Sequence, residues 1–428
     1  MVAFVIILFI VLLVIGVPIA LMLGLCSLIP LMVAHKIPAI VVAQKLFNGI
    51  DSFPMTAIPF FILAADLMSG GGITNRLMKF SNALLGHLRG GLAHVTVMLS
   101  MLFAGISGSA LADAAGPGAV MMRIMKEAGY DEDFSGALAA VAAVIGPIIP
   151  PSIIMVVYAI TEPSVSIAAL FIAGIIPGVL IGLALMGCNY VLAVKRNYRF
   201  SQSRLSVKEM AVHTWRAIPV LLLPVIIIGG ILSGIFTATE AAATATAYAL
   251  LVGLVTRELK LKQLPKILIQ SAVTSSSVLI IVSTASAFAW LITVLRIPQN
   301  LASVVAQFSS STYVFLFVVN ILLLIAGTVI DTLPAVLIFL PVLAPVAQQF
   351  HVHPLHFAII FCVNLCIGMV TPPHGPVLFV ISSISKVSIE RLTKAELPLL
   401  LATIVILFLI TYIPGLVLIL PRLFGLIR

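Results

Sequence analysis

Residues 103–113 read Phe-Ala-Gly-Ile-Ser-Gly-Ser-Ala-Leu-Ala-Asp, and residues 326–332 read Ala-Gly-Thr-Val-Ile-Asp-Thr. Each stretch interrupts an apolar segment midway, the first at 91–122 and the second at 312–348. Glycine and hydroxyl residues halfway along an apolar run predict a turn at membrane depth. Irregular backbone is tolerated there only where protein or a water-filled cavity surrounds it. We therefore predict two re-entrant helical hairpins, each with a tip that lines a site.

The composition of the whole chain agrees with a membrane setting. The 428 residues are 62% hydrophobic and 9% charged, whereas soluble domains carry about 25% charged residues. Apolar runs of about 20 residues recur along the chain, and the alternating segments of an outer-membrane barrel are scarce. The sequence thus predicts an all-α polytopic membrane protein. Besides the hairpins, we expect spans at 2–34, 54–69, 134–161, 166–194, 217–236, 238–256, 271–294, 356–385 and 398–421.

The basic residues predict how the chain is oriented. The loops that would face the cytoplasm hold 18 of the 23 Lys and Arg residues, which follows the positive-inside rule. This topology places the N-terminus in the cytoplasm and the C-terminus on the other side. The net charge of +9 is explained by loops facing anionic lipid, so we expect a lipid bilayer and no nucleic acid as partner. These loops are 70–89, 123–133, 195–216, 257–266 and 386–397.

An internal repeat relates the two hairpins. An offset of 222 residues aligns both copies without a gap. Five predicted spans separate the hairpins, so the second hairpin enters the membrane from the opposite side. Inverted repeats that contain paired broken helices are typical of secondary transporters. The offset matches Ala104-Gly105 with Ala326-Gly327, Ile145-Gly146 with Ile367-Gly368, Pro150-Pro151 with Pro372-Pro373, and Val165-Ser166-Ile167 with Val387-Ser388-Ile389.

Each hairpin tip is expected to face a helix broken by glycine and proline, at 146–152 in the first copy and at 368–374 in the second. Proline removes backbone donors and leaves carbonyl oxygens that, with hydroxyl groups, suit a hard cation such as sodium. Asp113 and Asp331 are carboxylates within apolar segments, where they normally face a pathway or a partner. The alternative is that small residues only ease helix packing and prolines only kink spans. Because the same pattern recurs in both copies at the 222-residue offset, we favour an ion site over packing alone.

Five motifs resemble the large membrane subunit of tripartite ATP-independent periplasmic (TRAP) transporters, and the resemblance covers essentially the whole chain. It implies an elevator-type fold and a sodium-coupled importer of a small carboxylate, such as a C4-dicarboxylate, sialic acid or another organic or sugar acid, across the bacterial inner membrane. It also implies two partners, a small four-helix membrane subunit and a soluble periplasmic substrate-binding protein. The motifs are Phe103-Ala-Gly-Ile-Ser-Gly-Ser, Gly146-Pro-Ile-Ile-Pro-Pro-Ser, Phe236-Thr-Ala-Thr-Glu-Ala-Ala-Ala, Gly327-Thr-Val-Ile-Asp-Thr and Thr371-Pro-Pro-x-Gly.

The resemblance also assigns site residues. Asp113, Ser152 and His374 would support the ion sites or contact substrate, and no transition metal is expected. His374 departs from the family, which more often has an apolar residue after the two prolines. One Na+ would sit among Ser107, Ser109, Gly146 and Pro150, and another among Gly327, Asp331, Gly368 and Thr371.

This interpretation divides the chain into a scaffold and a transport domain. The transport domain would consist of 91–165 and 312–385, each a hairpin with its broken helix. The scaffold would consist of 1–90, 166–311 and 386–428. Residues 73–87 have apolar side chains on roughly one face, so we expect them to form an arm in the membrane interface.

Other polar residues have simpler explanations. Glu240 follows Thr237 by three residues, as in a capping box. Asp66 is expected to extend its carboxylate toward the membrane surface or to cap its helix, rather than to bind an ion. Three rival functions stay open: a stand-alone anion- or proton-coupled transporter, a membrane-embedded enzyme, and a channel, which would need a continuous polar pore rather than two closed tips. The zinc, nucleophile-elbow and nucleotide motifs of common enzymes are missing from the sequence. Cys362 and Cys366 are expected in the core, and His351, His353 and His356 are weak metal candidates.

Overall fold

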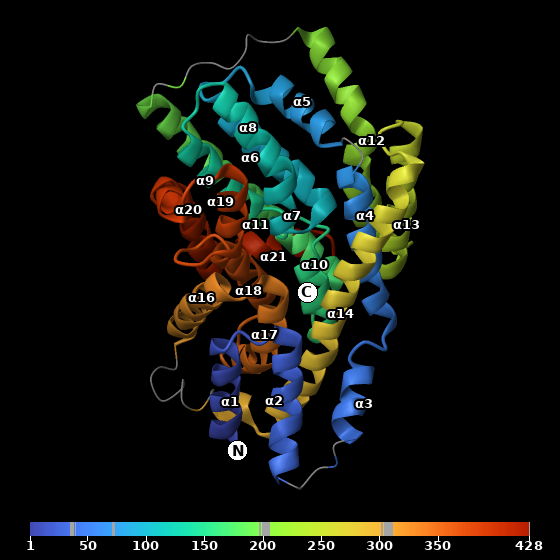
Figure 1. Ribbon diagram of the computed structural model, residues 1–428, viewed down its shortest axis with the longest axis vertical. Coiled ribbons are helices and arrows are strands. Elements are labelled where there is room, and N and C mark those ends of the chain that lie inside the picture. Colours follow the sequence, from blue (N-terminus) through green and yellow to red (C-terminus); the bar gives the residue numbers. More distant parts are fainter. Residues whose placement is uncertain are drawn as a thin grey trace.

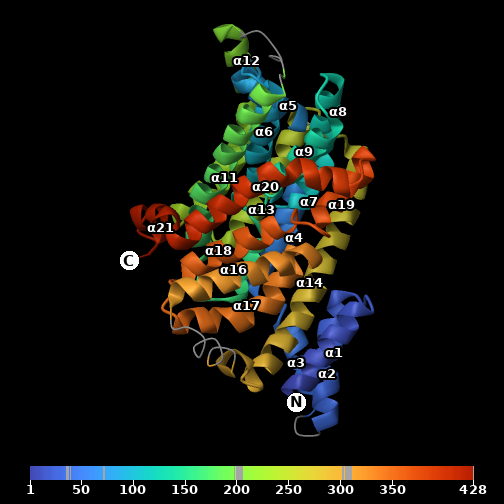
Figure 2. The ribbon, with the colours of Figure 1, turned by 90° about the vertical axis from the view of Figure 1, so that its left-hand side faces the viewer.

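The computed structural model describes residues 1–34, 38, 40–70, 73–196, 198, 206–300, 303 and 311–427. Within these ranges the elements are helices (Figures 1 and 2). Seven of the described helices are long and apolar enough to cross a membrane. An eighth span results if α3 (Ile40–Asn48) and α4 (Ala57–Gly70), which meet at 60° through the short η1 (Phe53–Thr56), count as one. The predicted all-α polytopic fold is confirmed.

Both predicted hairpins are present. In hairpin 1 the first limb is α6 (Gly91–Ser107), and the second comprises α7 (Ala110–Asp113), the π-helical turn η2 (Ala114–Gly118) and α8 (Ala119–Glu127). Gly108 forms the tip with φ of +60°, a conformation that glycine adopts without steric cost. Hairpin 2 joins α16 (Thr312–Val329) to α17 (Thr332–Gln349), and Asp331 is the N-cap of α17.

Both predicted broken helices are present as well. The first consists of α9 (Glu132–Ala143) and α10 (Ile153–Thr161), and the second of α18 (Pro354–Gly368) and α19 (Pro376–Ser385). Proline lacks the N–H that would continue an α-helix, so consecutive prolines in each break interrupt the helix. The Pro150–Pro151 and Pro372–Pro373 peptide bonds are cis.

Four further long helices complete the predicted set between the hairpins. Two of them begin several residues before the apolar segments predicted at 217–236 and 271–294, because polar residues in the first turns extend the helix. A capping box of Ser206 and Glu209 begins α12. The helices are α11 (Ile167–Lys195), α12 (Val207–Leu232), α13 (Ala238–Val255) and α14 (Leu264–Val294), the last preceded by η3 (Leu261–Gln263).

The single span predicted at 2–34 is wrong. The structure has two short helices there, α1 (Val2–Val14) and α2 (Ile19–Ala34), which pack against each other as a hairpin. Gly16 takes a left-handed φ of +80° and Pro18 cannot donate a backbone hydrogen bond, so α1 ends at Val14 and a new helix begins at Ile19. The N-terminus therefore lies at the same end as residue 34, opposite the end that holds α5 (Ile73–Leu85) and α8 (Figure 1).

The last predicted span, 398–421, is also divided. The helix α20 (Ile389–Tyr412) begins nearer to α19 than expected, and α21 (Pro414–Leu423) follows after Ile413. Pro414 disfavours the helical conformation for the residue before it, which explains the interruption.

Helix packing groups the chain into two sets. The hairpins and broken helices pack with α11 and α20, which also contact each other. The helices α4, α12, α13 and α14 pack mainly among themselves and with the N-terminal helices, and α14 also packs against α17 of hairpin 2. The arm predicted at 73–87 is the helix α5, which lies against both α6 and α12 and so connects the two sets. Ile73 and Leu77 on its inner face are fully buried.

Candidate functional site

The tip of hairpin 1 folds back on Asp113. The Ser107 hydroxyl donates a hydrogen bond to Asp113 Oδ1, and the Ser109 backbone N–H donates to Ser107 Oγ at 3.3 Å. Ser109 is the N-cap of α7, and its Oγ accepts from the Ala112 N–H at 3.4 Å. The sequence-predicted residues Ser107, Ser109 and Asp113 are thus brought together in one polar cluster at the tip.

The second carboxylate oxygen of Asp113 faces the broken helix. Asp113 is 1% exposed, and its Oδ2 has no hydrogen-bond partner among the residues that the structure describes. A Cβ atom added to Gly146 would lie 2.3 Å from this oxygen. The carboxylate is therefore pressed against the backbone of the first break at a position that only glycine fits. An unpaired buried carboxylate oxygen is a place where a cation or a proton is stabilising.

Pro150 and Ser152 lie in the same contact. A Cβ atom added to Gly108 would lie 2.8 Å from the carbonyl oxygen of Pro151, and one added to Gly105 would lie 3.8 Å from that of Pro150. The Ser152 hydroxyl donates to the Pro147 carbonyl at 2.5 Å and accepts from the Met155 N–H, so it stabilises the break itself.

Hairpin 2 meets the second break in the same way. A Cβ atom added to Gly327 would lie 2.9 Å from the Cα of Gly368, so the two backbones are in direct contact there. Asp331 is half-buried, and its Oδ1 accepts from the Thr332 N–H at 2.7 Å. The Thr371 hydroxyl, in the break, donates to the Ile367 carbonyl in the last turn of α18 at 2.9 Å.

The two hairpin tips share one small cavity of about 50 Å³. Ser109 lines it from the first tip and Asp331 from the second, so the structure unites residues that the sequence assigned to separate sites. The volume exceeds the 10–15 Å³ or so that one water molecule needs, so it has room for an ion with part of its hydration shell. The lining residues are Gly108, Ser109, Ala110, Leu111, Pro147, Ile153, Ile154, Asp331, Thr332, Leu333 and Met369.

Thr332 and Met369 were not predicted as site residues. Thr332 directly follows Asp331 in the sequence, and this position is a signal that could have identified it. Its hydroxyl lies 3.4 Å from Asp331 Oδ1. Met369 is an apolar residue in an apolar run and offered none. His374 is not among the lining residues. Its side chain is exposed, and its ring lies 6.1 Å from that of Phe379.

A buried polar network holds hairpin 2 to its neighbours. Asn364 in α18 donates to Asn320 in α16, at 2.5 Å to the side-chain oxygen and 3.1 Å to the backbone oxygen. Asn320 in turn donates to the Thr411 hydroxyl in α20 at 3.1 Å. All three side chains are buried. The network was not predicted, although each residue is a polar interruption of an apolar run.

The simpler explanations of other polar residues can be compared with the structure. Glu240 forms the predicted capping box with Thr237, and Cys362 and Cys366 are buried as predicted. Asp66 neither snorkels nor caps, because its Oδ2 accepts a hydrogen bond from Ser271 of α14 at 2.5 Å. Among the histidines, His356 contacts the Ile410 carbonyl and His353 caps α18.

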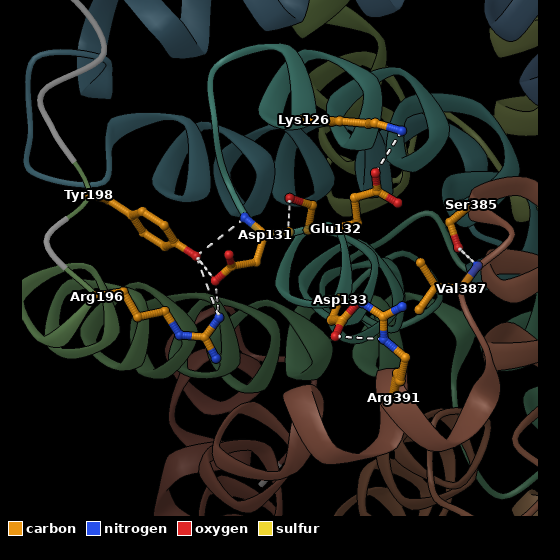
Figure 3. Close-up of polar contacts among 10 residues, drawn as sticks. Lys126, Asp131, Glu132, Asp133, Arg196, Tyr198, Ser385, Val387 and Arg391 are labelled. Atoms are coloured by element: carbon orange, nitrogen blue, oxygen red, sulfur yellow. Dashed lines mark hydrogen bonds and ion pairs between the residues drawn. The ribbon is translucent and has the colours of Figure 1, made fainter.

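Three consecutive acidic residues at the start of α9 are each paired with a base from a different element (Figure 3). Lys126 lowers the pKa of the Glu132 carboxyl through its hydrogen bond and its charge. The Arg196 guanidinium also lies 5.2 Å from the ring of Phe134. These contacts join α9 to the ends of α8, α11 and α20. They link Asp131 to Arg196 at 2.7 Å, Glu132 to Lys126 at 2.7 Å and Asp133 to Arg391 at 2.6 Å.

Two hairpins with tips that meet at one cavity, each backed by a proline-broken helix, define the class of the molecule: a secondary transporter built on discontinuous helices. The chain belongs to the family described as "Tripartite ATP-independent periplasmic transporter, DctM component", and the match covers residues 6–416.

Individual relatives agree with this family. The chain is 42% identical to the sialic acid TRAP transporter large permease protein SiaM of Vibrio cholerae over 89% of each chain. It is 41% identical to the C4-dicarboxylate TRAP transporter large permease protein DctM of Pseudomonas aeruginosa over 90% of each chain. The crystal structure of the Alcanivorax borkumensis YdaH transporter has the same fold, with a TM-score of 0.61 at 14% identity over 88% of each chain. The chain is thus a multi-pass transport permease and not an enzyme.

Proposed function

We propose that this chain imports a small carboxylate, coupled to sodium, across the bacterial inner membrane. The observation that carries the proposal is the cavity between the hairpin tips, which combines the Ser109 hydroxyl with the Asp331 carboxylate. The names of the relatives supply the substrate class, since they are permeases for sialic acid and for C4-dicarboxylates.

The geometry supports one sodium position in each repeat. In the first, Asp113 offers an unpaired oxygen against the Gly146 backbone, and Ser107 and Ser109 are adjacent. In the second, one carboxylate oxygen of Asp331 accepts a hydrogen bond from the Thr332 N–H, and Asp331 lines the shared cavity. Oxygen ligands of this kind suit a hard cation. Proton coupling is the second candidate, because the buried Asp113 oxygen can be satisfied by a proton instead.

We propose an elevator mechanism in which the hairpins and broken helices move as a unit relative to α12, α13 and α14. In this proposal α11 and α20 belong with the moving unit, because α11 packs against hairpin 1 and both broken helices, and α20 packs against both broken helices. This revises the division expected from the sequence. The arm α5 links the moving unit to the scaffold through α6 and α12.

The proposed topology keeps the basic loops in the cytoplasm and the C-terminus in the periplasm. Because 2–34 forms a hairpin rather than one span, the N-terminus moves to the periplasmic side in this proposal. The proposed partners are a small four-helix membrane subunit and a soluble periplasmic binding protein, as in a three-part transporter.

The test is uptake of labelled sialic acid and of succinate into proteoliposomes, with the candidate binding proteins and small subunit present or absent. We expect accumulation of one acid that requires an inward sodium gradient and both partners. Accumulation by the chain alone would contradict the tripartite proposal. Accumulation driven by a proton gradient in the absence of sodium would mean that the coupling ion is a proton and not sodium.

A further inference from the structure

A second cavity, of about 250 Å³, lies between the arm α5, the first turns of α12 and the segment after α13. Its described lining residues lie outside both hairpins, and the transport chemistry proposed above does not use them. Its lining is polar and mainly basic. The residues are Asn75, Arg76 and Lys79 of α5, His213 and Arg216 of α12, and Glu258.

Glu258 is the only carboxylate among the described residues that line this cavity, and it is already paired. Arg76 Nε lies 2.5 Å from Glu258 Oε1, and Arg76 Nη1 donates to the backbone oxygen of Arg216 at 3.2 Å. These bonds fix α5 against α12. Neither Lys79 nor the Arg216 guanidinium forms an ion pair with the described residues, and both are exposed. The cavity therefore presents two available cations to an anion from outside.

The surroundings place the cavity at the level of lipid headgroups. The candidate span of α12 begins at Lys208, so His213 and Arg216 lie in its first turns. Trp215 beside them is 76% exposed, and tryptophan is enriched at the boundary between headgroups and acyl chains. Farther along α12, Leu222 and Val225 are exposed apolar residues that acyl chains can cover.

We propose that this cavity binds the headgroup of an anionic phospholipid. The Arg216 guanidinium can donate two parallel hydrogen bonds to two oxygens of one phosphate, and Lys79 supplies a second positive charge. Basic pockets between helices at the cytoplasmic surface recognise such headgroups. A zwitterionic lipid carries its own cation, so it gains less from these two charges. The bound lipid would lie where the arm α5 joins α12.

The experiment compares two double variants that remove the same charge from the detergent-purified full chain. Lys79→Gln with Arg216→Gln removes both available cations of the cavity, and Lys262→Gln with Lys266→Gln removes two exposed cations outside it. Each protein is titrated with phosphatidylglycerol, phosphatidylcholine of equal chain length, and inorganic phosphate. Binding is followed by native mass spectrometry and by tryptophan fluorescence, to which Trp215 contributes.

We expect wild type to prefer phosphatidylglycerol. Because each cation near an anionic surface contributes about fivefold, the cavity variant should bind it about twenty-five-fold more weakly, and the control variant should stay near wild type. Equal weakening in both variants, no preference for phosphatidylglycerol in wild type, or phosphate binding as tight as lipid binding would each overturn the proposal. If the double variant does not fold, Lys79→Gln alone should show the fivefold effect.

Discussion

Replacing Gly146 with alanine tests the contact between hairpin 1 and the first broken helix. The added Cβ would lie 2.3 Å from Asp113 Oδ2 and 3.0 Å from its Cγ, and both residues are buried. A carbon and an oxygen in ordinary contact are more than 3 Å apart, so the carboxylate or the break must shift by about 1 Å. Asp113 is also held by Ser107, so the shift disturbs the whole tip.

The size of the effect follows from this clash. Overpacking a well-packed interior costs about 1–3 kcal/mol. If that cost falls on the ion-bound form, sodium affinity drops between about fivefold and a hundredfold, at roughly 1.4 kcal/mol per tenfold. Gly187→Ala in α11 is the matched control, because an added Cβ there has no atom of the described residues within 4 Å and the helical backbone accepts alanine.

The assay is the unfolding midpoint of the purified protein as a function of sodium concentration. We expect Gly187→Ala to be as stable as wild type or slightly more stable, with unchanged sodium dependence. Gly146→Ala should need a higher sodium concentration for the same stabilisation. If the two variants behave alike, Asp113 is not held against the break in the ion-binding form, and the reasoning is refuted.

Two further predictions concern residues around the second repeat. Replacing the exposed His374 with alanine should leave the sodium dependence of uptake in place, because His374 is not among the described residues that line the cavity between the tips; uptake that no longer responds to sodium would contradict this. Replacing Asn364 with leucine removes the donor to the buried Asn320 side chain and should lower the free energy of unfolding by about 1–3 kcal/mol. Denaturant unfolding measures this change, and the double variant with Asn320→Leu should lose less than the sum of the single variants.

The hairpins and broken helices were predictable because polar and helix-breaking residues within apolar runs have few structural solutions in a membrane. The repeat offset also paired Gly327 with Gly105 and Gly368 with Gly146, and the structure shows no room for a larger side chain at any of the four. Gly327 and Gly368 contact each other through their backbones, Gly105 lies against the Pro224 side chain, and Gly146 lies against the Asp113 carboxylate. Local sequence chemistry is sufficient for this part of the fold.

The shared cavity was not predictable, because it depends on how two tips more than 200 residues apart in the sequence are placed in space. The N-terminal hairpin was missed because Gly16 and Pro18 interrupt a run that stays apolar on both sides, and hydropathy does not register such a turn. The hydrogen bond between Asp66 and Ser271 likewise depends on which helices become neighbours.

The sodium dependence of uptake in Asp331→Asn tests most directly the claim that the hairpin tips bind the coupling ion. Asparagine is also a good helix N-cap, so α17 should keep its start while the charge is lost. Losing a charged ion ligand worth a few kcal/mol lowers sodium affinity on the order of a hundredfold. Ser109→Ala should have a smaller effect, and Asp51→Asn, the same change at an exposed residue, should have none. Unchanged sodium dependence in Asp331→Asn at matched membrane expression would contradict the account.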